Sequence, residues 1–174
     1  LAMSAAMRLR QGVRALTAWT RPVDGALAAS VLPPGLLALF YRLRRSEQLH
    51  SLRVLRTLRA AGEDDPDLMV AALLHDVGKT VGPFSLPERV LVVLTRKFAP
   101  ALYTRWGKGE PRGWTRPFAI SLRHPEWSAQ MVAAAGGSAR AVALCRRHAE
   151  PLTGPPRDET ERLLLALQQA DDLN

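Results

Sequence analysis

Apolar side chains recur along this chain with the spacing of helix faces. His50, Val54 and Leu58 stand at steps of four, which places them on one face of a helix. The run from Leu68 to Leu74 is wholly apolar, as expected for a helix buried in a core. No segment shows the alternation of apolar and polar residues that marks a half-buried strand. The pattern therefore predicts an all-α fold, a helical bundle.

Prolines, glycines and capping residues divide the chain into successive helices. Asp65-Pro66 is an N-cap followed by proline at the first helical position, and Gly78 is expected to end the helix that follows. The stretch 105–123 holds several glycines and prolines, so we expect it to be the longest irregular segment. The expected helices are Pro34 to about Arg44, about Glu47 to Ala60, Asp67 to about Asp76, Leu86 to Phe98, a helix that begins at Pro125 and ends at Gly136, a helix that is capped by Ser138 and carries His148 in its last turn, and a final helix that starts at Asp158 and carries Asp171.

The first 32 residues predict a basic extension. Leu9, Val13 and Leu16 form a short apolar stripe, and the neighbouring arginines lie off it. We expect this amphipathic helix to pack on the core of its own domain, and the alternative is peripheral contact with a membrane surface. The chain is therefore divided into an extension over residues 1–32 and one helical domain over residues 33–174.

Composition fits an ordinary globular protein of 174 residues, 47% apolar and 23% charged. The uncharged stretch from Gly25 to Tyr41 is interrupted by Pro33-Pro34, so we expect no transmembrane segment. Cys145 is the single cysteine, which excludes an internal disulfide and favours a reducing, cytoplasmic location. The net charge of +8 favours anionic partners such as phosphate esters, nucleic acid or an acidic membrane surface.

All four histidines of the chain, together with two aspartates, follow a spacing that suits one shared metal site. Successive steps along the chain are 25, 48, 24 and 23 residues, which leave about one helix and one connection between candidates. In a helical bundle, each helix can then send one side chain to a common interior point. The candidate metal ligands are His50, His75, Asp76, His124, His148 and Asp171.

The residue types at these positions indicate which metals they would bind. His75 and Asp76 end an almost wholly apolar helix, where two polar groups need partners that a metal would supply. Imidazole nitrogen and carboxylate oxygen suit Fe, Mn, Zn, Co or Ni. Four histidines and two aspartates exceed the needs of one closed site, and they suit a two-metal centre bridged by the two oxygens of Asp76. Cys145, three residues before His148, is an alternative thiolate ligand, although we expect a buried structural thiol there.

Five short motifs around these residues resemble the HD-domain superfamily, whose signature is H…HD…D on an all-helical bundle. The resemblance spans about residues 33 to 174. The motif that begins at His124 is similar to the H-P-E-x-[GS]-A motif of the two-metal branch. The five motifs are His50-Ser51-Leu52-Arg53-Val54, His75-Asp76-Val77-Gly78-Lys79, His124-Pro125-Glu126-Trp127-Ser128-Ala129, His148-Ala149-Glu150 and Ala170-Asp171.

The resemblance implies two divalent metal ions, with Fe or Mn favoured and Zn, Ni, Co or Mg as alternatives. Asp171 is favoured over Asp172 because it is the first aspartate after the apolar run. Lys79 would face the open side of the site. The implied ligands are His50, His75, Asp76 and Asp171 for one metal, and Asp76, His124 and His148 for the other.

The activity implied by the resemblance is hydrolysis of a nucleotide-like phosphomonoester or phosphodiester, in which a hydroxide bridging two metal ions attacks phosphorus. Asp76 and Lys79 would be catalytic, and Lys79 and Arg147 would bind the small phosphorylated substrate. The alternative is a di-iron oxygenase of the same superfamily that acts on a small polyol or phosphonate. Arg147 replaces the second histidine of the cyclic-di-GMP phosphodiesterase branch, and the G-x-G-Y-P loop of that branch is absent from the sequence, so that assignment is not supported. The motifs leave the oligomeric state open.

Overall fold

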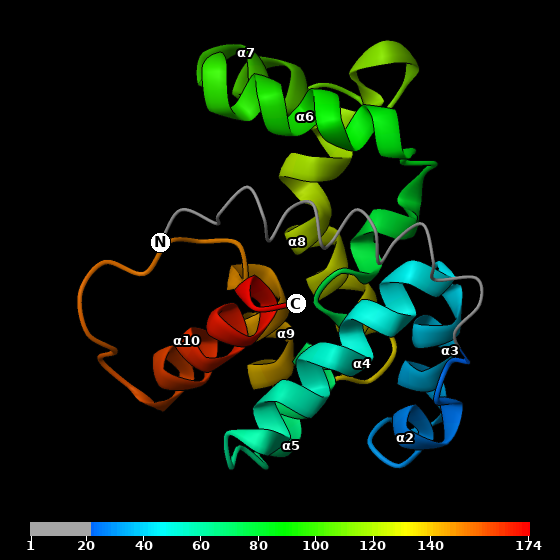
Figure 1. Cartoon of the computed structure of the whole chain (residues 1–174), viewed down its shortest axis with the longest axis vertical. Coiled ribbons are helices and arrows are strands. Elements are labelled where there is room, and N and C mark those ends of the chain that lie inside the picture. Colours follow the sequence, from blue (N-terminus) through cyan, green and yellow to red (C-terminus); the bar gives the residue numbers. More distant parts are fainter. Residues whose placement is uncertain (1–21) are drawn as a thin grey trace.

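A computed structural model of the chain describes residues 22–174, and every regular element in this part is helical (Figure 1). The all-α prediction is therefore confirmed. The predicted amphipathic helix of Leu9, Val13 and Leu16 lies outside the described residues. None of the helices in residues 22–174 is both long and apolar enough to cross a bilayer. In chain order, the elements are α2 (Gly25–Ala29), α3 (Pro34–Arg42), α4 (Arg45–Ala60), α5 (Pro66–Leu74), the 3₁₀ helix η2 (Val77–Val81), α6 (Leu86–Phe98), α7 (Pro100–Gly107), the 3₁₀ helix η3 (Gly113–Thr115), α8 (Arg116–Ala134), α9 (Ala139–Arg147) and α10 (Glu159–Asp172).

The apolar helix α5 lies at the centre of the bundle, as its sequence predicts. Leu68 and Leu74 have no exposed surface, and α3, α4, α9 and α10 all contact α5. Ala28 and Leu32 belong to the same buried cluster. Residues before the predicted boundary at position 33 thus contribute to the main core.

Capping residues begin several helices where the sequence predicts them. The Asp65 carboxylate accepts hydrogen bonds from two backbone N–H groups at the start of α5, at 2.9 and 3.0 Å. Ser138 Oγ accepts the N–H of Ala141, and Asp158 accepts the N–H of Glu161. Each cap satisfies a donor that the first turn of a helix leaves unpaired, which explains why these three starts were identifiable from sequence.

The prediction that α5 continues to Asp76 and ends at Gly78 is wrong. The helix ends at Leu74, with His75 as its C-cap. Asp76 then precedes η2, so Gly78 lies inside a tight 3₁₀ turn. At this junction the side chains of His75 and Asp76 lie close together, with Nε2 of His75 3.7 Å from Oδ2 of Asp76.

The predictions for residues 105–123 and for Pro125 are also wrong. The segment contains the end of α7, all of η3 and the first two turns of α8, and Pro125 lies inside α8. Proline has no N–H, so the carbonyl of Ser121 loses its usual helical donor. Nδ1 of His124 donates to that carbonyl at 2.9 Å instead. The helix therefore passes through the proline, and His124 lies in its middle.

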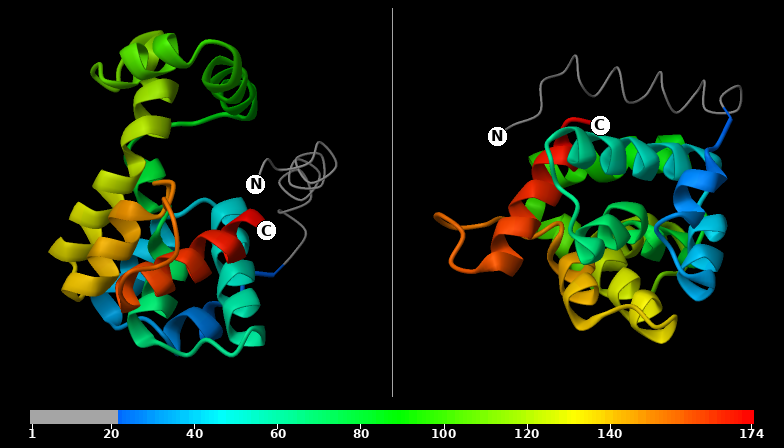
Figure 2. Two further views of the ribbon diagram at one scale, coloured as in Figure 1. Left: turned by 90° about the vertical axis from the view of Figure 1, so that its left-hand side faces the viewer. Right: turned by 90° about the horizontal axis from the view of Figure 1, so that it is seen from below.

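The helices α6 and α7 form an arm that stands apart from the main body (Figures 1 and 2). The arm packs on the first half of α8. Its attachment includes the ring of Trp106, whose centroid lies 5.0 Å from that of Phe118. A small core lies where the arm meets α8, and it is composed of Phe84, Val92, Tyr103, Phe118 and Ile120.

The 3₁₀ helix η2 presses directly against the backbone of α8 at Gly78. The N–H of Gly78 donates to Ser128 Oγ at 2.8 Å. A Cβ atom at position 78 would lie 2.2 Å from the carbonyl oxygen of His124 and 2.8 Å from the backbone nitrogen of Ser128. Helix backbone cannot move aside locally, so glycine fixes the spacing between Asp76 and His124.

The substitution Gly78→Ala is expected to lower the free energy of unfolding by about 3 kcal/mol, because its methyl group overpacks a backbone contact. Urea denaturation measures the loss. Gly82→Ala is the matched control, since its methyl group would meet only the ends of the Ile120 and Arg116 side chains, at 3.2 and 3.5 Å. Its cost should stay within about 1 kcal/mol. Equal losses of unfolding free energy in Gly78→Ala and Gly82→Ala would contradict this role of Gly78 in the contact with α8.

Candidate metal centre

The structure brings together all six side chains that the sequence predicts as ligands. Their donor atoms form two groups, and within each group all atoms lie within 4.8 Å of one another. The two groups adjoin, because His75 Nε2 lies 3.7 Å from Asp76 Oδ2. The members are His50, His75 and Asp171 in the first group, and Asp76, His124 and His148 in the second.

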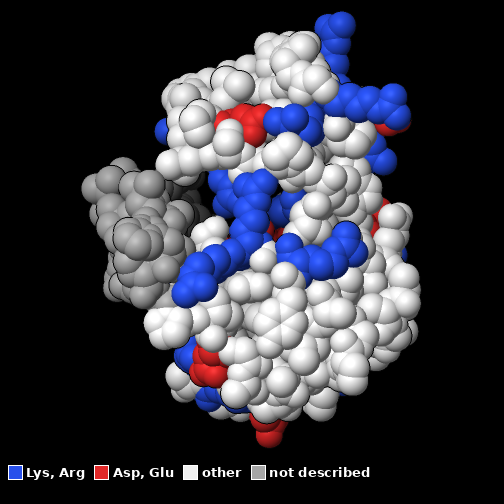
Figure 3. Space-filling view, turned by 90° about the vertical axis from the view of Figure 1, so that its right-hand side faces the viewer, with Lys and Arg blue, Asp and Glu red and all other residues white. Residues whose placement is uncertain are grey.

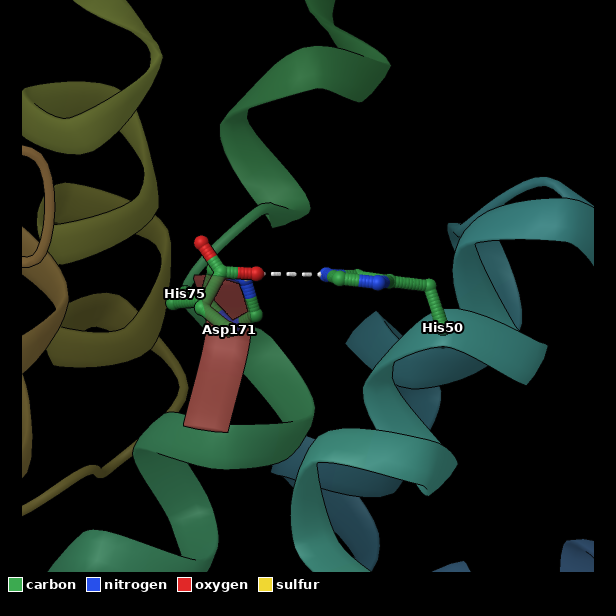
Figure 4. A group of neighbouring side chains, drawn as sticks. All are labelled: His50, His75 and Asp171. Carbon is green, nitrogen blue, oxygen red and sulfur yellow. Dashed lines mark ion pairs between the residues drawn. The ribbon is translucent and has the colours of Figure 1, made fainter. Parts of the chain in front are cut away.

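The first group leaves a buried nitrogen without a partner. His50 Nε2 lies 2.8 Å from Asp171 Oδ1, and His75 Nε2 lies 3.7 Å from the same oxygen (Figure 4). His75 is fully buried, and its Nε2 has no hydrogen-bond partner among the described residues. Such an atom costs free energy unless something satisfies it. A cation held between His75 and Asp171 would do so, and the arrangement therefore fits a metal ion.

The second group is arranged around the carboxylate of Asp76. Its Oδ1 lies 3.3 Å from His124 Nε2 and 3.7 Å from His148 Nε2. Its Oδ2 faces His75 and lies 2.5 Å from Nζ of Lys79. The two oxygens of one buried carboxylate thus point to different groups of donor atoms.

Backbone carbonyls orient the three buried histidine rings. In each ring Nδ1 faces the carbonyl three residues earlier, which is one helical turn away. A carbonyl can only accept, so Nδ1 carries the proton and Nε2 keeps its lone pair. This arrangement is typical of histidines that bind metals through Nε2. The distances from Nδ1 to the carbonyl oxygen are 3.2 Å for His75, 2.9 Å for His124 and 2.7 Å for His148.

Burial keeps two of these rings neutral. It lowers the pKa of His148 to about 3, and the nearby His75 and His124 add to the effect. Burial, together with the Lys79 ammonium, also lowers the pKa of His124. At neutral pH both rings therefore offer lone pairs rather than positive charge.

The two aspartates remain ionised in spite of their burial. Burial raises the pKa of the Asp76 carboxyl, but Lys79, His75 and His124 outweigh it and hold that pKa well below its ordinary value. Burial acts in the same direction on Asp171, where the hydrogen bond from His50 and the proximity of His75 outweigh it and lower the pKa. Two carboxylates among imidazoles form a donor set that suits divalent transition metals.

A hollow of about 740 Å³ opens over these ligands, and a second hollow of about 700 Å³ extends from it toward the arm. Lys79, Arg96 and His124 line both. Figure 3 shows Lys and Arg side chains gathered where the surface is hollowed between the arm and the body. The expectation that Lys79 faces the open side of the site agrees with this placement.

Arg147 does not lie where the sequence suggests. Its guanidinium donates to Glu161 at 3.2 Å and to Glu150 at 3.3 Å, and Arg147 is absent from the described residues that line the two hollows. Consecutive residues on a helix point about 100° apart, so the neighbour of His148 is turned toward the start of α10. The placement argues against a substrate contact and indicates a structural ion pair.

The two alternative ligands are placed outside the donor groups of the described residues. Cys145 is buried, and burial with the charge of Asp76 raises its pKa to about 12, so it remains a thiol. Asp172 is exposed on the rim of the first hollow, while Asp171 reaches His50.

Arg96 is the residue at this site that sequence reasoning missed. It lies on α6, and no carboxylate pairs with it within residues 22–174. Its guanidinium carbon is 6.0 Å from the centroid of the Tyr103 ring. Arg89, Val92 and Arg96 share one face of α6 through their spacing of three and four, which was the only signal available.

The chain belongs to the HD domain family, which matches it over residues 49–174. The matched region contains all six candidate ligands and covers most of the chain. Comparisons with curated proteins and with solved structures found no match. Membership confirms the superfamily suggested by the motifs, most of whose members are metal-dependent hydrolases.

The metal-free protein is expected to lose stability as the pH falls below about 6.5. Burial lowers the pKa of His148 to about 3 and lowers that of His124 as well, whereas both rings protonate near pH 6.5 when unfolded, so the unfolded state binds more protons. Each ring should lower the free energy of unfolding by up to about 1.4 kcal/mol per pH unit. Urea denaturation in a chelator from about pH 7.5 to 5 measures the slope. His148→Gln should flatten it, and a flat profile for the unsubstituted protein would refute the account.

Proposed function

We propose that this protein is a phosphohydrolase that uses two divalent metal ions and acts on a small, nucleotide-like phosphate ester. The observation that carries the proposal is the position of Asp76, whose Oδ1 faces His124 and His148 while its Oδ2 faces His75. A carboxylate in this position can contribute one oxygen to each of two adjacent sites. Membership of the HD domain family supports the same activity.

The ligands would divide as the two groups of donor atoms do, with Asp76 shared between them. When bound, two such ions lower the pKa of water and neutralise charge on a phosphoryl group. Imidazole and carboxylate donors favour Fe or Mn, and Zn, Ni, Co or Mg are the other candidates. The chain itself holds the rings in one tautomer and keeps both carboxylates ionised, so little reorganisation accompanies binding.

We infer that Lys79 acts on the substrate. Its Nζ contacts Asp76 Oδ2, and its side chain lines both hollows. If Oδ2 of Asp76 served as a ligand, the Lys79 ammonium would lose this partner and could reach into the hollow. In the hollow, the ammonium of Lys79 would meet a phosphoryl oxygen as a point charge. It would stabilise the negative charge that develops as the ester bond breaks.

Arg96, rather than Arg147, is the arginine positioned to hold the substrate. It borders both hollows, so it can reach a group bound at the ligands and one bound toward the arm. Each hollow has a volume typical of small-molecule sites, and together they leave room for the remainder of a nucleotide-like substrate beyond the phosphate. A guanidinium suits planar, bidentate recognition of an anionic oxygen pair.

The proposal is tested by measuring metal content per chain together with turnover on a panel of phosphate esters. We expect about two divalent ions per chain and release of phosphate or of a phosphomonoester. Consumption of O₂ by the iron-loaded protein, without hydrolysis of any ester, would instead favour the oxygenase alternative.

The substitution Asp76→Asn should lower both metal content and turnover, the latter by roughly 10²-fold. It removes one charge, and an amide nitrogen cannot serve as a ligand. Asp172→Asn is the matched control, because this neighbouring carboxylate lies outside both donor groups. It should retain metal and most of its turnover. Full metal content and activity in Asp76→Asn would sink the two-metal assignment.

Arg96→Gln should raise KM about tenfold and leave kcat within a few-fold, because it removes a contact with the bound substrate rather than with the reacting atoms. Arg147→Gln should leave KM unchanged because Arg147 lines neither hollow, and its cost in stability should be small because Arg157 also pairs with Glu161. Steady-state kinetics on the best ester of the panel distinguish the two variants. A raised KM in Arg147→Gln, together with an unchanged KM in Arg96→Gln, would instead identify Arg147 as the substrate-binding arginine.

A further inference from the structure

The arm carries most of the exposed apolar surface in the described part of the chain. Eleven large apolar side chains are exposed in residues 22–174, and six of them lie on α6. Phe98 is 73% exposed. Isolated exposed apolar residues are common on proteins, but a concentration of this kind marks an interaction surface. The six are Leu86, Val90, Leu91, Val93, Leu94 and Phe98.

Five of these side chains share the outer face of α6, and the sixth, Val93, lines the second hollow. Leu86, Val90, Leu94 and Phe98 follow steps of four, which align them along the helix over about 20 Å. The opposite face carries Val92, which is 3% exposed and packs into the small core between the arm and α8. The outer face is therefore not needed for folding of the arm, and nothing in the described part of the chain covers it.

The net charge of this region indicates which kind of partner could cover the outer face of α6. Residues 86–116 contain seven basic and two acidic residues, a net charge of +5. A second copy of the chain would bring an equally basic arm against it. Residues 1–21 carry four arginines and no acidic residue, so they too are poorly matched. The complementary partner is anionic and offers apolar material.

We propose that the outer face of α6 binds the surface of an anionic membrane. A stripe of aliphatic and aromatic side chains, flanked by cations, is the pattern of helices that lie in the membrane interface. Lys97 is the single charged residue beside this stripe, where its ammonium can meet lipid phosphates, and Lys108 and Arg112 add positive charge in the connection after α7. A fluid hydrocarbon boundary demands no shape complementarity, which suits a face that offers no hydrogen-bonding group besides Lys97.

The test is co-sedimentation of the full chain with vesicles of about one-third phosphatidylglycerol in phosphatidylcholine, compared with phosphatidylcholine alone. We expect binding to the anionic vesicles only, weakened by salt. The double variant Val90→Glu with Leu94→Glu should reduce the bound fraction at least about tenfold while its melting temperature stays unchanged, because both side chains point outward. The matched control, Ala133→Glu with Ala134→Glu, adds the same charge at exposed positions on the far end of α8 and should bind normally.

Three outcomes would overturn the proposal. One is equal or absent binding to both kinds of vesicle. Another is vesicle binding that persists in the variant Val90→Glu with Leu94→Glu but is lost in the full chain with Leu9→Glu and Val13→Glu. This result would assign the membrane contact to the N-terminal segment. The third is a dimer in analytical ultracentrifugation that the α6 variant dissociates, which would assign the face to a second copy.

Discussion

The rest of the structure depends on the buried carboxylate of Asp76. An ionised carboxylate without partners would cost several kcal/mol in this interior, so its surroundings must supply compensating charge and dipoles. Lys79 comes from η2, His124 from α8 and His148 from the end of α9. Each compensating group therefore requires a different element to be in place. The contact of Gly78 with α8 sets the distances among them, which ties the packing of the bundle to the electrostatics of one residue.

The same backbone that builds the helices also prepares the candidate ligands. Carbonyls at the ends of α5 and α9 and at a proline inside α8 hold the three buried rings in one tautomer. Gln168 adds a further restraint, since it donates to the carbonyls of His148 and Glu150 and fixes the chain after α9. Groups restrained in this way lose little freedom when a ligand arrives, which favours tight binding. The proline that weakens α8 locally thus frees the carbonyl that orients His124.

The sequence predicted those features of the fold that depend on residues close together in the chain. The caps at Asp65, Ser138 and Asp158 and the apolar run of α5 were identifiable because short-range hydrogen bonds and burial determine them. Pro125 misled because proline begins helices far more often than it lies within them, and the compensating donor is a side chain whose orientation depends on tertiary contacts. The six clustered side chains could be anticipated from spacing and motif. The different surroundings of Arg96 and Arg147 could not, because they depend on which way α6 and α9 turn in the assembled fold.

The division into body and arm separates the two tasks that the site would perform. The body supplies every candidate ligand, while the arm supplies Arg96 and Tyr103 from a helix pair that packs on α8 through a small separate core. Changes on the arm can therefore alter which molecules fit the second hollow without disturbing the donor atoms. The two faces of α6 extend this separation, because Val92 and Arg96 serve the interior and the site while the outer stripe remains available for docking. If the outer face of α6 binds a membrane, the same rigid helix both holds the protein at the membrane and lines the second hollow. Membrane binding would then influence which molecules reach the site without any change in the ligands.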